Sequence, residues 1–384
     1  MIRKKLIRIS TAPISLHKLL KGQLKFMSIY YDVVAVSSYS DVLETVRENE
    51  GIRIKGVEMT RKITPVQDIK ALWKMFRFLR REKPFIVHTH TPKAGIVGMI
   101  AASLAGVPVR LHTVAGLPLM EATGNKRRLL NFVEKMTYSL ATKVYPNSYG
   151  LRDFIVSEKL CNEKKLQVIG SGSSNGIDTA YFDSVPFTVE EKKNLRESLQ
   201  IDEKDFVFIF IGRLVKDKGI NELVAAFSGL KAKNCKLLLV GPFEKDLDPL
   251  LLKTELEIEN NPNIISVGYQ DDVRTFLAIS DCLAFPSYRE GFPNVVMQAG
   301  AMDLPSIVTN INGCNEIIIH NKNGVIIPPK DENALLGAMD YFLHHPEEVN
   351  RMAKNARSLI AERYEQRVVW EALLEEYNRL LKKD

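Results

Sequence analysis

Short apolar runs alternate along the chain with longer segments in which apolar residues recur every three or four positions. The runs predict strands over residues 5–9, 32–37, 85–89, 109–113, 143–146 and 166–169, and again over 206–211, 236–240, 263–267, 282–286, 305–309 and 325–327. The longer segments predict helices over 66–82, 94–105 and 126–141, and helices that begin near Asn221, Asp271, Asn294 and Asn315. Strands that alternate with helices form parallel sheets, and the pattern occurs twice. We therefore expect an α/β protein with two doubly wound, Rossmann-like domains.

The join between the two domains is expected where the pattern breaks. Pro186 interrupts it, and Thr188 with Glu191 forms a capping-box sequence that begins a new helix. We expect a first domain over residues 1–185 and a second over 186–361. The charged helical end of the chain, about 362–384, is expected to pack back on the first domain.

The two halves differ in charge, although the whole chain carries a formal net charge of +7. Residues 1–185 contain 29 Lys and Arg against 15 Asp and Glu, whereas residues 186–384 contain 24 against 31. A basic half can face nucleic acid, anionic lipid or a phosphorylated substrate, or it can be a solvated surface without a specific partner. No aromatic platform or nucleic-acid motif accompanies the basic residues, so we expect no nucleic-acid partner.

The composition favours a cytoplasmic protein. The four cysteines are scattered without metal-ligand spacing, which is typical of free thiols in a reducing compartment. The longest weakly polar run, residues 95–107, is shorter than the roughly 20 residues that span a bilayer. We therefore expect a soluble chain, or one that lies at most on a membrane surface.

Two cations follow the first apolar run of the second half. The run over 206–211 leads into Gly212, and Arg213 and Lys218 stand before the next helix. In parallel sheets ligands bind beyond the carboxyl ends of strands, where a guanidinium and an ammonium suit a diphosphate. The spacing matches neither a Walker A loop nor a dinucleotide fingerprint, and two ordinary surface cations are the alternative interpretation.

A second motif follows the predicted strand 282–286. Pro293 suits the first turn of a helix, whose backbone N–H groups and dipole favour a phosphate. Glu290 would then face the group attached to that phosphate, because a carboxylate accepts hydrogen bonds from sugar hydroxyls. Gln298, two turns into the helix, could bind a ribose. The predicted donor site also includes the backbone and side chains between these residues: Gly291, Phe292, Pro293, Asn294 and Val295.

These motifs together resemble glycosyltransferase family 4 on the GT-B fold. The resemblance covers nearly the whole chain, through the blocks at 88–95, 174–178, 212–214, 290–294 and 313–316. It implies two domains facing a central cleft and a nucleotide-sugar donor, with Arg213 and Lys218 on its diphosphate and Glu290 on its sugar. It also implies retention of anomeric configuration, catalysis by these three residues, and no metal or cofactor, since the two cations replace a metal.

Three positions depart from the family pattern. The E-x7-E motif ends in Gln298 instead of a second glutamate, so the nucleotide preference is less defined. The usual Gly-Gly turn after the first strand is replaced by residues 10–13, Ser-Thr-Ala-Pro. Ala115 and Gly116 stand where relatives often have His-Gly, which weakens the assignment of a catalytic histidine.

Candidates for the acceptor or sugar site lie in the basic half. His90 with Lys93, and His112 with Gly116, follow or end predicted strands, where they could orient a ligand, although a structural role is the favoured alternative for each histidine. His88 and His90 lack the accompanying carboxylates or cysteines of a zinc site.

An amphipathic helix is expected over residues 14–28, with Lys18, Lys21 and Lys25 on one face. Residues 126–128 add a second basic cluster. Packing on the sheet is the simpler interpretation of the helix. The alternative is that these patches attract anionic lipid or a lipid-diphosphate acceptor, which would place the protein on the inner face of the cytoplasmic membrane.

The predicted function is transfer of a sugar from a UDP-hexose or UDP-N-acetylamino sugar to a lipid-linked or polysaccharide acceptor in bacterial surface glycan assembly. Two alternatives stay open at this point: a sugar-nucleotide epimerase of the same fold, and a nucleic-acid-binding protein that uses the basic half.

Overall fold

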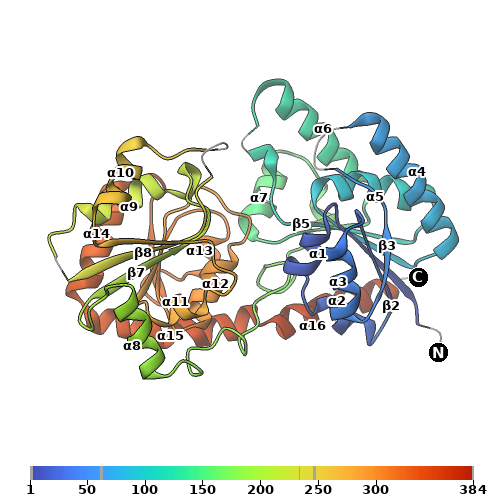
Figure 1. Ribbon diagram of the computed structural model, residues 1–384. Helices are drawn as coiled ribbons and strands as arrows, with labels where there is room; N and C mark the ends of the chain where they lie inside the picture. The colour runs from blue at the N-terminus through green and yellow to red at the C-terminus, as the bar shows by residue number, and fades with distance from the viewer. Residues whose placement is uncertain (1–2, 61–63, 121, 233, 245–247, 383–384) are drawn as a thin grey trace. The chain divides into compact units, whose positions relative to one another are not determined.

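The structure, a computed structural model, describes residues 3–60, 64–120, 122–232, 234–244 and 248–382. The chain forms two compact units, one of residues 1–176 with 366–384 and one of residues 177–365 (Figure 1). We expected the join at 185/186, but residues 177–185 belong to the second unit. Arg357 holds this segment there by donating to the carbonyl oxygens of Thr179 and Phe182 at 2.8 and 2.9 Å.

The first unit contains a six-stranded sheet in the order β3-β2-β1-β4-β5-β6, and all its pairs are parallel. Its strands are β1 (Lys5–Ile9), β2 (Asp32–Ser37), β3 (Arg53–Gly56), β4 (Ile86–His90), β5 (Val109–Val114) and β6 (Lys143–Pro146). The direction of winding reverses between β1 and β4, and such a reversal is where doubly wound sheets bind ligands.

Helices cover both faces of this sheet. They are α1 (Pro13–Leu19), α2 (Gln23–Ser28), α3 (Asp41–Glu50), α4 (Pro65–Glu82), α5 (Pro92–Leu104), α6 (Gly124–Leu140), α7 (Tyr149–Ser157) and the C-terminal α16 (Gln366–Leu381). One buried cluster joins α4, α5, α6 and α7 to the sheet, and the other joins α1, α2, α3 and α16 to its opposite face. The last helix of the chain therefore completes the core of the first unit.

Two sequence predictions in this unit are wrong. Residues 166–169 form no strand, because their pairing is limited to a single bridge between Leu166 and Val144. The helix expected over 14–28 is two helices, and Gly22 between them has φ 80°. A Cβ at Gly22 would lie 2.6 Å from the Trp370 ring, so the turn needs glycine both for its conformation and for this contact.

The second unit repeats the winding with the strand order β12-β11-β10-β7-β8-β9. Its strands are β7 (Phe206–Ile211), β8 (Cys235–Val240), β9 (Ile264–Gly268), β10 (Cys282–Phe285), β11 (Ser306–Thr309) and β12 (Gly324–Ile327). Its helices are α8 (Val189–Ser198), α9 (Ile220–Ser228), α10 (Leu252–Asn260), α11 (Arg274–Ala278), α12 (Asn294–Ala301), α13 (Cys314–Ile317), α14 (Glu332–His344) and α15 (Pro346–Tyr364). Here the winding reverses between β7 and β10.

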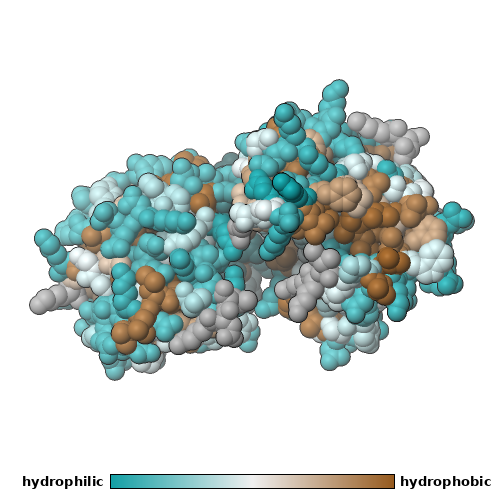
Figure 2. All heavy atoms as spheres, turned by 90° about the horizontal axis from the view of Figure 1, so that it is seen from above, coloured by the Kyte–Doolittle hydropathy of each residue, from teal (hydrophilic) through white to brown (hydrophobic). Residues whose placement is uncertain are grey.

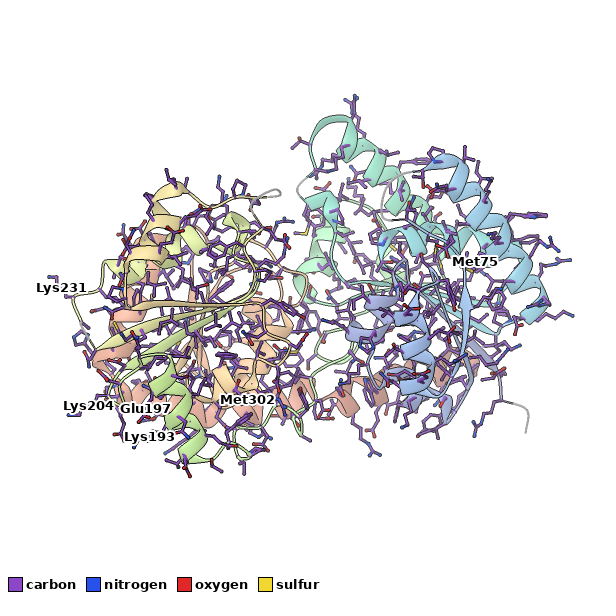
Figure 3. All side chains as sticks on the ribbon, viewed as in Figure 1. Met75, Lys193, Glu197, Lys204, Lys231 and Met302 are labelled. Carbon is purple, nitrogen blue, oxygen red and sulfur yellow. The ribbon has the colours of Figure 1, made fainter. Side chains whose placement is uncertain are left out.

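One helix of the second unit begins where the sequence predicts it. Thr188 and Glu191 form the predicted capping box at the start of α8, whose outer face carries Lys193 and Glu197 (Figure 3). Met302, at the end of α12, is buried in the core between the sheet and its helices. The two doubly wound domains predicted from the sequence are therefore confirmed.

Candidate active site

The loop after β7 lies against the loop after β10, at the reversal of the second sheet. A short 3-10 turn over Lys216–Lys218 ends at Gly219, which has φ 72° and begins α9. A Cβ at Gly219 would lie 2.2 Å from the carbonyl oxygen of Pro286, so only glycine permits this close approach. The contact brings together two motifs that are distant in the sequence.

Lys218 and Glu290 form an ion pair at this junction. The Lys218 ammonium donates to Glu290 Oε1, and each side chain is only 16% exposed. Ser287 Oγ donates to the same carboxylate oxygen at 3.0 Å. Two donors therefore fix the orientation of Glu290.

Arg213 is held at the same sheet edge by a different carboxylate. Its Nη1 lies 2.7 Å from Oε2 of Glu244, in the segment after β8, and its side chain is 44% exposed. The hydrogen bond to Glu244 is the main cause of a raised pKa at Arg213. Glu244 was not among the predicted site residues, although its position just after a buried strand is typical of ligand-binding residues in parallel sheets.

The loop that carries Glu290 is braced on both sides. Asn312, after β11, donates from Nδ2 to the carbonyl oxygens of Glu290 and Gly291 at 3.1 and 2.6 Å. Arg289 pairs with Asp217 at 2.5 Å, which ties this loop to the turn after β7. The backbone around Glu290 is therefore fixed by neighbours in the loops after β7 and β11.

The remaining predicted donor residues lie on or just before α12. Pro293 immediately precedes the helix instead of occupying its first turn, and Asn294 begins it. Phe292 packs on the Tyr364 ring at 5.4 Å, while Val295 and Gln298 are half-buried on the first two turns. Gln298 is the farthest of these from Glu290 along the chain.

Two threonines meet at the corresponding reversal of the first sheet. The hydroxyl oxygens of Thr11, after β1, and Thr91, after β4, lie 2.7 Å apart, and Thr11 Oγ1 accepts from the Ala94 N–H at 3.1 Å. Thr91 has φ 72°, a strained conformation for a β-branched residue. Thr11 thus replaces the expected glycine turn with side-chain hydrogen bonds.

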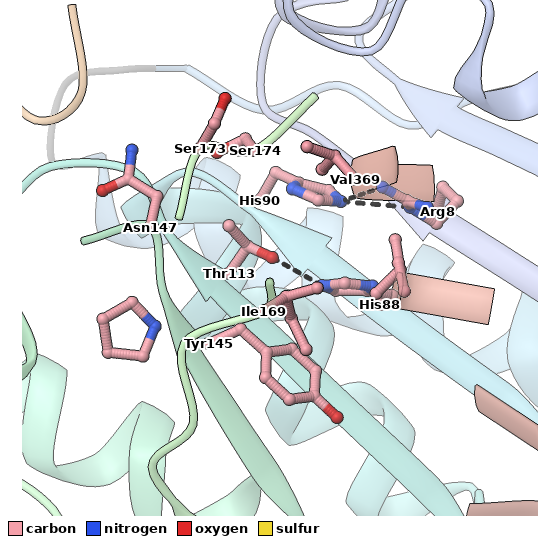
Figure 4. Close-up of a pocket in the computed structure, with 12 residues that line it drawn as sticks. Arg8, His88, His90, Thr113, Tyr145, Asn147, Ile169, Ser173, Ser174 and Val369 are labelled. Atoms are coloured by element: carbon pink, nitrogen blue, oxygen red, sulfur yellow. Dashed lines mark hydrogen bonds between the residues drawn. The ribbon is translucent and has the colours of Figure 1, made fainter. Parts of the chain in front are cut away.

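Arg8, near the carboxyl end of β1, is completely buried among neutral partners. Its Nε and Nη2 lie 3.1 and 2.9 Å from His90 Nε2 (Figure 4). Nη2 also donates to Gln23 Oε1 at 2.6 Å. Nη1 donates to the hydroxyl of Tyr377 on α16 at 3.1 Å. A cavity of about 20 Å³, whose lining includes Arg8, His88, His90 and Asn147, has room for about one water molecule. Sequence reasoning missed Arg8, because a lone basic residue in an apolar strand carries no motif.

The candidate histidines are buried and neutral. His88 and His90 stack with ring centroids 4.5 Å apart, and burial lowers the pKa of both. His112 is 2% exposed, and its Nδ1 lies 2.7 Å from Thr89 Oγ1. Burial lowers the pKa of His112 to about 4. These placements fit structural roles. His88 and His90 line the cavity beside Arg8, and His112 does not.

The other candidates of the first unit do not gather at one point. Lys93 pairs with Asp68 Oδ2 at 2.5 Å. Gly116 lies in the loop after β5. Lys18 and Lys21 are exposed on α1 and in the turn after it. Among the residues that the structure describes, no group of three or more His, Cys, Asp or Glu side chains is arranged to hold a metal ion.

Comparison with known proteins decides the family. Residues 191–359 match the family model described as glycosyl transferases group 1, and residues 31–172 match the glycosyl transferase 4-like domain. CapM, a capsular polysaccharide biosynthesis glycosyltransferase of Staphylococcus aureus, is 33% identical over 95% of this chain and 94% of its own. The chain belongs to the family 4-like glycosyltransferases.

Other relatives agree with this placement of the glycosyltransferase. The Escherichia coli UDP-Gal:alpha-D-GlcNAc-diphosphoundecaprenol alpha-1,3-galactosyltransferase is 30% identical over 79% of this chain and 77% of its own. The solved structure of Anabaena HepE in complex with UDP superposes with a TM-score of 0.80 at 17% identity, covering 98% of this chain and all of that one. That similarity shows the GT-B fold.

In the glycosyltransferase Lys218 and Glu290 form an ion pair, and Arg213 stands after β7 at the same sheet edge. The partners that sequence reasoning missed, Glu244, Ser287 and Asn312, all stand on segments that follow strands. None of the described helices of the enzyme is both long enough and apolar enough to cross a bilayer.

Proposed function

We propose that this glycosyltransferase moves a sugar, with retention of anomeric configuration, from a UDP-hexose or UDP-N-acetylamino sugar to a lipid-diphosphate-linked acceptor in bacterial surface polysaccharide assembly. The relationship to CapM over nearly the whole chain supports the polysaccharide role. The E. coli relative, which uses UDP-Gal and a diphosphoundecaprenol-linked sugar, supports the donor and acceptor classes. The relatives named here transfer sugars, which favours transfer over epimerisation and over nucleic-acid binding.

The Lys218–Glu290 pair carries the assignment of the donor site. A diphosphate that enters between Arg213 and Lys218 would replace the carboxylates of Glu244 and Glu290 as the partner of each cation. Glu290 would then be free to accept hydrogen bonds from sugar hydroxyls, while Ser287 keeps its orientation. The backbone of residues 291–295 and Gln298 would complete the nucleotide site.

The reaction needs no cofactor in this proposal. The acceptor oxygen bonds to the anomeric carbon on the face from which the nucleotide diphosphate departs, as the carbon–oxygen bond to the diphosphate breaks. The departing phosphate oxygen takes the acceptor proton. Arg213 and Lys218 stabilise the negative charge that develops on the leaving group, a role that a metal ion fills in other transferases.

The acceptor is assigned to the first unit. The carboxyl edge of its sheet carries Thr11, Thr91 and the cavity beside His90, and Lys93 begins α5 there. Lys18, Lys21 and the basic cluster at 126–128 give this unit affinity for a diphosphate lipid or an anionic membrane. The proposed location is the inner face of the cytoplasmic membrane.

The test combines a panel of UDP-sugars with a short-chain polyprenyl-diphosphate sugar and measures UDP release with and without that acceptor. We expect release that depends on the acceptor, and a product whose new linkage keeps the donor's anomeric configuration by NMR. An inverted linkage would contradict the retaining mechanism. Interconversion of the UDP-sugar without acceptor would identify an epimerase instead.

A further inference from the structure

Helix α4 of the first unit carries an apolar stripe on its outer face. Val66, Ile69 and Trp73 recur at intervals of three and four residues and are 68%, 67% and 59% exposed. Met75, on the inner face of the same helix, is completely buried (Figure 3). The stripe therefore does not belong to the core, which α4 already fills from its other side.

Helix α6 carries a matching stripe. Leu129 and Phe132 are 45% and 62% exposed, whereas Glu134, Thr137 and Tyr138 form the buried side of the helix. A large exposed aromatic on each of two helices is unusual for a solvated surface, because contiguous exposed apolar areas mark interaction sites.

Helix α5 joins the two stripes into one surface. It packs against both α4 and α6, and its sequence is apolar on all sides. Ile96 and Ile100 are half-buried along it. Figure 2 shows hydrophobic residues gathered on this side of the first unit. We call the surface formed by Val66, Ile69, Trp73, Leu129, Phe132 and the α5 isoleucines the α4–α6 face.

Basic side chains border the α4–α6 face. Lys70, Lys74 and Arg77 are exposed beside the stripe of α4, and Arg128 and Lys135 are exposed beside that of α6. The acidic residues of these two helices are engaged elsewhere: Asp68 pairs with Lys93, Glu82 pairs with Lys5, and Glu134 is buried. The border therefore presents positive charge around an apolar centre.

We propose that the α4–α6 face rests on the surface of an anionic lipid bilayer, with Trp73 and Phe132 at the headgroup level. An apolar stripe between cations is the pattern of helices that lie in a membrane interface, and anionic headgroups complement the basic border. Beside the lysines of α1, Leu16 and Leu20 are buried, and Ile14 and Leu19 are 38% and 42% exposed, less than the apolar residues on the outer face of α4.

The orientation also suits the proposed acceptor. Helices α4, α5 and α6 each begin at the carboxyl edge of the sheet, where Thr91 and the cavity beside His90 lie. A lipid-diphosphate acceptor held in the bilayer would therefore present its headgroup near this edge. This consequence rests on the proposed function, whereas binding of the face to lipid does not.

The experiment uses the full chain with vesicles of phosphatidylglycerol and phosphatidylethanolamine, and with vesicles of phosphatidylcholine alone. Co-sedimentation of the unmodified chain should require phosphatidylglycerol. Ser replacement of both Trp73 and Phe132 should weaken partitioning at least tenfold, since each loses its buried apolar area. The matched control replaces Val189 and Leu252, which are 84% and 72% exposed in the second unit, with Ser, and should bind as the unmodified chain does.

A second measurement follows Trp73 itself. Trp370 is the other tryptophan, so in Trp370→Phe the emission comes from Trp73 alone. On binding to vesicles, the Trp73 emission should shift to the blue and be quenched by brominated acyl chains. Lys70→Gln and Lys74→Gln should each weaken binding to phosphatidylglycerol vesicles about fivefold.

Unquenched Trp73 emission, or equal partitioning of the face variant and its control, would overturn the proposal. Loss of self-association in the face variant without any vesicle binding would assign the face to a second copy of the chain instead. Vesicle binding needs no turnover, so a failure of the transferase assay leaves this result intact. Conversely, transfer to a soluble short-chain acceptor should be unchanged in the face variant.

Discussion

Glu290 Oε1 accepts hydrogen bonds from both the Lys218 ammonium and Ser287 Oγ. Lys218 stands after the central strand β7, and Glu290 stands after its neighbour β10, so the pair spans the reversal of the sheet. Both side chains are largely shielded from water, which strengthens their mutual attraction relative to a surface pair. The carboxylate is therefore oriented before any donor binds, and a diphosphate is the kind of group that can take over the ammonium.

Arg213→Ala should lower turnover about 10²–10³-fold, because a donor that stabilises developing negative charge contributes that much. Folding should be little affected, since the Arg213 side chain is 44% exposed. Steady-state UDP release together with the circular dichroism spectrum checks both parts. Glu244→Gln is the matched control: it removes the carboxylate partner but keeps the guanidinium, so turnover should stay near that of the unmodified enzyme. Unchanged turnover in Arg213→Ala would remove Arg213 from the diphosphate site.

Glu290→Gln should impair use of the donor sugar more than binding of free UDP. The amide keeps the size of the side chain but loses the charge that accepts from sugar hydroxyls and from Lys218. Transfer rates and UDP affinity, measured by calorimetry on the same preparation, separate the two effects. Ser287→Ala, which removes only the orienting hydroxyl, should give a smaller loss of transfer with unchanged UDP affinity. Equal losses of transfer and UDP binding in Glu290→Gln would move the residue out of the sugar site.

The sequence predicted the architecture because buried parallel strands are apolar and end at turns. All six strands of the second unit were identified, since each contains a short apolar run, including the edge strands β9 and β12, which are only partly buried. The edge strand β3 was missed because its four residues, Arg53–Gly56, alternate between exposed and half-buried and carry no apolar run. The break at Gly22 was missed because the leucines around it keep a helical period across the turn.

Residues of the candidate site could be selected from the sequence only where a motif marked them. Arg213, Lys218 and Glu290 follow strands within recognisable blocks. Their partners Glu244 and Asn312 depend on which strands are neighbours in the sheet, and local spacing does not contain that information. Arg8 illustrates the same limit, since its partner Tyr377 lies almost the whole chain length away.

The buried histidines should make the first unit sensitive to acid. The folded pKa of His112, about 4, lies below the unfolded value near 6.5, so between these values the unfolded chain binds more protons. Above about pH 6.5 the contribution of His112 to the free energy of unfolding is complete. It falls by about 3 kcal/mol as the pH drops from the unfolded pKa to the folded pKa. In His112→Asn, the free energy of unfolding should no longer show this part of its decrease on acidification. Urea unfolding followed by fluorescence, from two tryptophans that both lie in the first unit, measures it. Parallel pH profiles for the variant and the unmodified chain would contradict a buried neutral His112.

Glu134 should act in the opposite direction, because burial raises its folded pKa to about 7, above the ordinary value of 4.5 for a glutamate. Between these values the folded state binds the proton and the unfolded state does not, so stability falls as pH rises through the window. Glu134→Gln, which keeps a neutral side chain at every pH, should therefore gain about 3 kcal/mol relative to the unmodified chain between about pH 4 and pH 8.

The same urea titrations at several pH values measure the difference in unfolding free energy between Glu134→Gln and the unmodified chain. Because the histidines titrate equally in both proteins, this difference reports on Glu134 alone. The neighbouring Tyr138 side chain lowers the pKa of Glu134, against the larger effect of burial, so Tyr138→Phe should extend the fall in stability to higher pH. A constant difference between Glu134→Gln and the unmodified chain across the range would show that the carboxyl is solvated in the folded protein. A shift to lower pH in Tyr138→Phe would show that the hydroxyl favours the neutral acid.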